Sequence, residues 1–109
     1  MPGDQESVND LLYFGTAKPN GVVTPEEWAA FLATSVTPRF PAGLTVWQGS
    51  GQWRNESGDV VREGSFVLNL VHPDDQSSET AVHALAAEYK SRFNQDAVLR
   101  VKSHACVSL

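Results

Sequence analysis

The sequence predicts a single α+β domain in which two helices cover one face of a four-stranded antiparallel sheet. Two segments carry apolar residues at helical spacing, and four others have the alternating or continuously apolar pattern of strands. These segments follow one another in the order β-α-β-β-α-β, which matches the split βαβ, ferredoxin-like arrangement. The expected strand order is therefore 4-1-3-2, and a chain of 109 residues has room for one such domain.

The first strand is expected over residues 11–17, where the run LLYFGTA is apolar, rich in aromatic residues and followed by the turn-forming KPNG. The polar and acidic residues 1–10 ahead of it are expected to form a flexible tail. The folded domain is therefore expected to span residues 11–109.

The first helix is expected to start after Thr24, because Thr24 and Glu27 form a T-x-x-E capping box and Pro25 suits the first helical position. Pro38 and Pro41 are expected to end this helix, since proline has no backbone N–H to donate. The residues at helical spacing that predict its buried face are Trp28, Phe31, Leu32 and Val36.

The next two strands are expected to form a hairpin from residues 43–55 and 60–72, joined by the turn-forming NESGD. The segment Gly49–Gly51 interrupts the first of them, which predicts a β-bulge or a close approach of another part of the chain. A bulge would reverse the direction of one flanking tryptophan, so the sequence leaves open whether Trp47 and Trp53 share a face.

The second helix is expected over residues 79–94 and the last strand over residues 97–109. Alternation along the strands then divides their side chains between the two faces of the sheet. The side chains expected in the core are Leu12, Phe14, Phe66, Leu68, Leu70, Leu99, Val101 and Ala105. Those expected on the bare face, which no helix covers, are Leu11, Tyr13, Glu63, Ser65, Val67, Asn69, Arg100, Lys102, His104 and Cys106.

The bare face would gather groups suited to acid–base chemistry or to binding a small polar or anionic molecule. Tyr13 and Glu63 are the candidate catalytic pair, which would handle protons. Arg39, which stands between two prolines, would bind negative charge through its planar guanidinium group. The candidate ligand-binding residues are Arg39, Gln52, Trp53 and Ser65.

Several alternatives stay open at this point. The bare face can be only the solvated side of the sheet, or a surface through which two copies pair as a homodimer. The chain can be a non-catalytic protein-interaction module, in which Arg39 and Glu63 form a structural ion pair. It can also be a cofactor-free isomerase or monooxygenase of the dimeric α/β-barrel kind, which would place Tyr13 or His104 in an apolar cavity. The sequence does not decide whether the chain is an enzyme.

Composition argues against several classes of protein. The net charge is −5 and the eight Lys and Arg residues are scattered, so no nucleic-acid-binding surface is expected. No run approaches the roughly 20 apolar residues of a transmembrane helix, so no membrane contact is expected. Cys106 is the only cysteine, which excludes an intrachain disulfide and a Cys-rich zinc site. Without a signal-peptide pattern the expected location is cytoplasmic, and neither a metal nor a cofactor is expected.

Several short motifs resemble those of an uncharacterised bacterial family of about this length, known as a domain of unknown function. The motifs are YFG (13–15), VTPEEWAAF (23–31), TPRFPAGLTV (37–46), GQW (51–53) and the RE, S, VL and L positions of 62–70. The resemblance spans about residues 11–107 and supports the expected limits of the domain. It marks Arg39, Gln52, Trp53 and Glu63 as motif members and implies no catalytic residue. Some relatives carry export leaders, so the resemblance by itself implies no single location.

Overall fold

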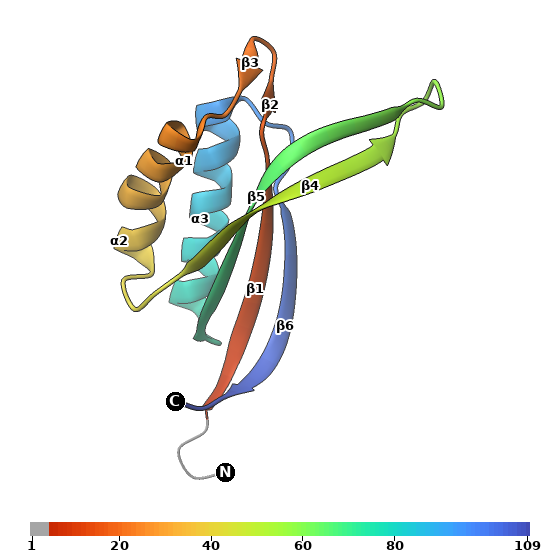
Figure 1. Cartoon of the computed structure of the whole chain (residues 1–109). Coiled ribbons are helices and arrows are strands. Elements are labelled where there is room, and N and C mark those ends of the chain that lie inside the picture. Colours follow the sequence, from red (N-terminus) through yellow and green to blue (C-terminus); the bar gives the residue numbers. More distant parts are fainter. Residues whose placement is uncertain (1–4) are drawn as a thin grey trace.

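The computed structural model describes residues 5–109 and has the predicted architecture (Figure 1). Its strands are β1 (Gln5–Gly15), β2 (Ala17–Lys18), β3 (Gly21–Val22), β4 (Thr45–Arg54), β5 (Val60–Pro73) and β6 (Leu99–Val107). Its helical segments are α1 (Pro25–Phe31), the π-helical η1 (Leu32–Val36), α2 (Thr37–Arg39) and α3 (Gln76–Phe93). The four long strands form an antiparallel sheet in the order β4-β5-β1-β6, and the helices lie on one side of it. The predicted strand order is confirmed.

The core lies between the helices and one face of the sheet. Phe14 of β1 packs against Trp28 and Phe31 of the first helix and against Tyr89 of α3, with ring centroids 4.6–5.9 Å apart. Trp28 stacks on Phe66 of β5 at 4.7 Å. The prediction that Leu12, Phe14, Phe66, Leu68 and Leu70 face the core is confirmed.

The first strand begins earlier than the sequence indicates. Residues 5–10, which the sequence pattern assigns to a flexible tail, pair with β6, and from Ser7 onward they pair with β5 as well. Val8 and Asp10 are fully buried. The run ESVND looks like a tail because its polar residues are satisfied by partners that are distant in sequence. The rest of the predicted tail, residues 1–4, lies outside the described residues.

The first helix does not end at Pro38. The capping box of Thr24 and Glu27 starts it as predicted, but the chain then widens into η1, where the Thr37 N–H donates to the Leu32 carbonyl five residues back. This wider turn leaves room for the Pro38 ring, which would clash with the preceding turn of a regular α-helix. One further helical turn follows before the chain leaves the helix at Phe40.

The last strand faces opposite to the prediction. Arg100 lies directly across from Leu12 of β1, on the helix side, while Leu99 and Val101 lie on the bare face with 61% and 47% of their surface exposed. Leucine and valine alternation alone would put these two in the core. The buried carboxylate of Asp10 decides the orientation, because it accepts two hydrogen bonds from Arg100.

The hairpin of β4 and β5 extends beyond the helices as an arm (Figure 1). The chain measures 53 × 30 × 22 Å, and its radius of gyration of 15.4 Å exceeds the value of about 13 Å expected for a compact chain of this length. The pairing of β4 with β5 runs without interruption from Thr45 to Arg54, so the predicted bulge at Gly49–Gly51 is wrong. Because the register is regular, Trp47 and Trp53 point to the same face, which is the bare one.

Candidate functional site

The bare face of the arm forms a shallow trough whose floor is glycine backbone. Gly49 lies opposite Ser65 and Gly51 lies opposite Glu63, while the rows on either side carry Trp47 and Trp53. We call this surface the glycine trough and define it by Trp47, Gly49, Gly51, Trp53, Glu63 and Ser65. Since side chains alternate along a strand, all six positions share one face of the sheet.

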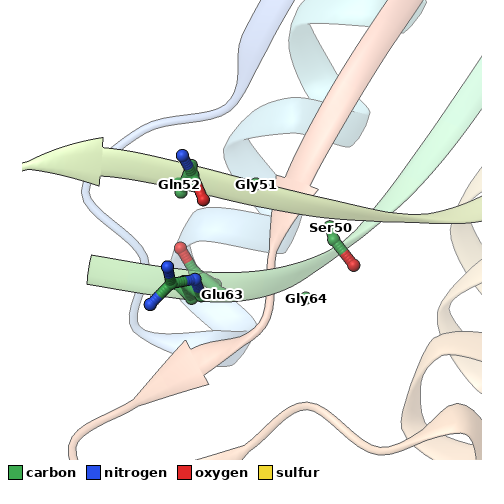
Figure 2. Close-up of a pocket in the computed structure, with 6 residues that line it drawn as sticks. Ser50, Gly51, Gln52, Glu63 and Gly64 are labelled. Carbon is green, nitrogen blue, oxygen red and sulfur yellow. The ribbon is translucent and has the colours of Figure 1, made fainter. Parts of the chain in front are cut away.

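Two hollows border the arm. One of about 350 Å³ is lined by residues 50–52 and 62–64 (Figure 2). It includes Gly51 and Glu63 of the trough, but Ser50, Gln52, Arg62 and Gly64 belong to the opposite face of the arm. Figure 2 shows Gln52 on β4 and Glu63 on the neighbouring β5, with bare glycine backbone between Gln52 and Ser50. A second hollow of about 190 Å³ is lined by Gln48, Phe66 and Pro25 at the start of α1, among others, so it lies on the helix side of the sheet and not in the trough. Both hollows are open to solvent.

Two exposed indoles bound the trough. Trp47 and Trp53 expose 47% and 50% of their surface, and six residues of extended strand separate them by about 20 Å. On the Trp47 side, the next strands continue the row with Val67 and Tyr13. Val67 is only 3% exposed although it lies on the bare face, so its larger neighbours cover it. The trough therefore ends at the apolar row of Trp47, Val67 and Tyr13 on one side and at Trp53 with Val61 on the other.

A backbone N–H group from the segment after β1 holds the Glu63 carboxylate in place beside the trough. The carboxylate accepts a hydrogen bond of 2.6 Å from the Ala17 N–H, and a Cβ atom at Gly15 would come within 3.0 Å of it. Glycine at position 15 thus makes room for this carboxylate. The same corner is tied to α3, because the Tyr89 hydroxyl donates to the Gly15 carbonyl at 2.6 Å. Burial, followed by the charges of Glu63 and Glu27, raises the pKa of that phenol.

The glycine at position 49 has a different role from the one at position 51. A Cβ atom at Gly49 would lie 3.2 Å from the Ser65 hydroxyl, so a side chain at this position would crowd Ser65. A Cβ atom at Gly51 would meet nothing closer than 3.7 Å. The space above Gly51 is therefore open to a ligand.

Of the six residues predicted for the site, the structure places Trp53, Glu63 and Ser65 on one face of the arm, with Glu63 in the row between those of the other two. Tyr13 lies on the same face but four residues of strand away from Glu63, which is about 13 Å. That distance excludes direct proton transfer between the two side chains in this arrangement. Gln52 pairs with Arg62 on the opposite face of the arm.

Arg39 lies in α2, within the helical layer. Its guanidinium donates to the Ser35 carbonyl at 2.8 Å and lies 3.7 Å from the carboxylate of Glu88 on α3. The alternative in which Arg39 forms an ion pair with Glu63 is therefore wrong. Arg39 instead joins the two helices to each other.

A buried charge network on the helix side was not predicted from the sequence. Asp10 is fully buried and contacts His72 of β5 at 2.5 Å and Arg100 of β6 at 2.7 Å. Arg100 also binds Glu79 at the start of α3 at 2.7 Å. Hydrogen bonds from Arg100, and then from Lys102 and His83, hold the pKa of Glu79 well below its ordinary value.

The network leaves a trace in the sequence, since Asp10 stands two residues before Leu12 and so on the core side of its strand. A charged residue at such a position needs a buried partner. Because each carboxylate oxygen of Asp10 has a donor or ring nitrogen beside it, we interpret the network as structural.

Two further features of residues 5–109 concern metals and membranes. In this part of the chain no three His, Cys, Asp or Glu residues are grouped so that they could hold a metal ion. None of the helices described is both long and apolar enough to cross a membrane.

Comparisons with known proteins give a family and a fold. The family described as "Protein of unknown function (DUF3574)" matches residues 9–109. A search of curated proteins gave no match. Among solved structures, a phage SAM lyase in complex with S-methyl-5'-thioadenosine has a TM-score of 0.68 at 15% identity, covering 94% of this chain and 90% of that one. A phage SAM lyase in the apo state has a TM-score of 0.64 at 15% identity, covering 95% and 90%. At this identity the likeness shows a shared fold.

Proposed function

The chain belongs to the DUF3574 family, and we propose that it binds a small polar molecule of the nucleoside type in the glycine trough. The observation that carries this proposal is the trough itself. Two indoles on one face of an exposed arm flank open glycine backbone with a carboxylate and a hydroxyl beside it. Small-molecule sites commonly combine such aromatic walls with a few polar groups that fix orientation.

Each part of the trough suits one part of such a ligand. The exposed face of Trp53 can stack on a flat heterocycle. The Glu63 carboxylate, already fixed by the Ala17 N–H, can accept hydrogen bonds from sugar hydroxyls. The open backbone at Gly51 lets a ligand approach the strand without meeting a side chain.

The charge of the trough favours a neutral or cationic ligand over an anionic one. Its one charged residue is Glu63, while Arg39, expected from the sequence to bind negative charge, contacts Ser35 and Glu88 in the helical layer. Arg62 belongs to the opposite face of the arm. A carboxylate beside indole rings suits a sulfonium or ammonium group, which rings attract through their electron-rich faces.

The fold comparison supports the same ligand class. One of the phage structures that share this fold is a complex with S-methyl-5'-thioadenosine, a nucleoside thioether. Since 90% of that chain is covered, the likeness extends over almost the whole domain. We carry over the ligand class as part of the proposal and no residue role.

A thermal-shift experiment tests the proposal with S-methyl-5'-thioadenosine, adenosine and SAM as probes and inorganic phosphate as a comparison. We expect at least one nucleoside, and not phosphate, to raise the melting temperature of the wild type. Trp53→Ala and Glu63→Gln should lose this rise, while Gln52→Ala, changed on the opposite face of the arm, should keep it. If no nucleoside stabilises the wild type, or if Trp53→Ala and Glu63→Gln respond as the wild type does, the proposal is wrong.

The competing function is a non-catalytic protein-interaction module. The same exposed indoles could dock a protein, and the probe series separates the two, because a protein-docking surface would not distinguish nucleosides from phosphate. The isomerase or monooxygenase alternative loses its support. Tyr13 is 36% exposed, and His104 is exposed and paired with Asp74 at 3.1 Å, so neither side chain lies in an apolar cavity.

A further inference from the structure

The outer edge of β4 is a long and unprotected strand edge. In the described structure β4 is the last strand on its side of the sheet and pairs with β5 alone. Over its ten residues it contains no proline or lysine, its pairing has no bulge, and Arg54 is its one charged residue. Proteins commonly guard exposed edges with these devices, because unpaired N–H and C=O groups can pair with another chain. The opposite edge, β6, carries Arg100 and Lys102.

The sequence of this edge reads the same in both directions. Residues 47–53 are WQGSGQW, which is symmetric about Ser50. When two identical strands pair antiparallel around a twofold axis, residue i of one copy lies opposite a residue j of the other, and the sum i + j is constant. With the axis at Ser50, the sequence therefore places residues of the same type opposite each other at every position of this segment.

We propose that two copies of the chain pair through their β4 edges, antiparallel and centred on Ser50, to form one continuous eight-stranded sheet. In this register Trp47 lies opposite Trp53 of the second copy, and Gln48 lies opposite its Gln52. Directly opposed side chains share a face, so the bare faces of the two copies become one surface. A shift of the axis by one residue would set tryptophan opposite glycine.

The distribution of charge also supports a second copy of the chain as the partner of the β4 edge. The paired segment 45–53 has no charged residue, so two chains of net charge −5 can approach here without bringing like charges together. The arm tip, which carries Glu56 and Asp59, would come beside residues 41–45 of the second copy. Those residues carry no charge either. The tip therefore meets a segment that does not repel it.

The second copy also completes the glycine trough, and this part of the inference rests on the proposed function. In one copy the trough has one indole at each end, Trp47 and Trp53. Pairing would set a tryptophan of the second copy beside each of them. The floor would then hold Gly49 and Gly51 of both copies between two tryptophan pairs, with one Glu63 on each side.

Cysteine cross-linking tests the register. The variants are made in a Cys106→Ser background. Ser50→Cys places the new thiols of the two copies directly opposite each other, within reach of a disulfide. In a dimer of Gln48→Cys chains, or of Gln52→Cys chains, the two thiols would be about 13 Å apart, because position 48 of one copy lies opposite position 52 of the other. We expect mild oxidation to link Ser50→Cys chains, to leave each glutamine variant unlinked, and to link a mixture of Gln48→Cys and Gln52→Cys chains.

The mass in solution gives an independent test. We expect light scattering over a concentration series to show twice the mass of one chain for the wild type. Ser50→Lys, which sets two positive charges opposite each other at the axis, should remain monomeric and melt as the wild type does when it is diluted to its monomer. Ser91→Lys, at an exposed position on α3, should stay dimeric. A monomeric wild type, or Gln48→Cys linking as well as Ser50→Cys, would overturn the proposal. A dimer that binds no nucleoside would refute only the proposed function.

Discussion

The three tryptophans show how differently two regions of this chain are built: the body, which is the helices with the part of the sheet that they cover, and the arm formed by the hairpin of β4 and β5. Trp28 is 6% exposed and stacks on Phe66 inside the core. Trp47 and Trp53, on the arm, expose 47% and 50% of their surface. A buried tryptophan contributes to folding through the apolar area that it removes from water. The two on the arm leave half of that contribution unused, so folding of one chain does not explain them.

The same contrast holds for the strands that carry these residues. β1 has neighbours on both sides and a helical layer over one face, while every residue of β4 except Gly49 is exposed. A two-stranded hairpin has marginal stability in water when nothing packs on it. We therefore expect changes in the body to alter the stability of the chain and changes in the arm to alter what it binds.

The largest loss of stability is expected from a substitution at Asp10, in the centre of the body. Asp10→Ala removes the carboxylate that is fully buried between His72 and Arg100 and leaves the Arg100 guanidinium without its buried partner. Breaking a buried ion pair in this way typically costs about 3–5 kcal/mol of unfolding free energy. Denaturant unfolding measures the loss, with Asp96→Ala at an exposed position as the control. A loss below about 1 kcal/mol would mean that the network does not hold the body together.

The fold was predictable because its signals are local. The capping box at Thr24, the turn-forming segment between the hairpin strands and the alternation of Phe66, Leu68 and Leu70 each involve residues close together in sequence. Strand order then followed from the sequence of elements.

The sequence-based predictions were wrong where a contact between residues far apart in the sequence determines the structure. The orientation of β6 depends on a contact between Arg100 and Asp10, which are 90 residues apart. The same contact hides the true start of β1, because it makes a polar segment part of the sheet. Pro38 was misjudged for a local reason, since a π-helical turn at Leu32–Val36 is rare and has no clear sequence signal.

The site was predicted in part for similar reasons. Trp53, Glu63 and Ser65 lie on adjacent strands of one hairpin, so alternation could assign them to one face. Arg39 was placed with them because its chemistry suited a site, yet no pattern in the sequence fixes where a helical arginine points. Its partners Ser35 and Glu88 are set by the packing of two helices.

A smaller loss of stability is expected from a substitution at Glu79, where the start of α3 contacts β6 at the edge of the body. Hydrogen bonds from Arg100, and then Lys102 and His83, depress the pKa of Glu79 below its ordinary 4.5. A carboxylate with a lowered pKa in the folded state stabilises it fully above the unfolded value, and this contribution is lost as the pH falls below about 4.5. Glu79→Gln should therefore be less stable than the wild type at pH 7, and the difference should shrink toward pH 3. Melting curves across this range measure it, and a difference that stays constant with pH would contradict the assignment.

The smallest effect on stability, and the largest on binding, is expected from Trp53→Ala at the far end of the arm. The side chain is half-exposed and stands one residue before the end of β4, so its loss should change the unfolding free energy of the monomer by no more than about 0.5 kcal/mol. Trp28→Ala, the matched change in the body, should cost about 3–5 kcal/mol because it empties a packed core. Denaturant unfolding at a low protein concentration isolates the monomer, and thermal shift with nucleosides then reports binding. If Trp53→Ala destabilises the isolated chain as strongly as Trp28→Ala does, the arm belongs to the folding unit, and its indoles need no ligand or second copy to account for them.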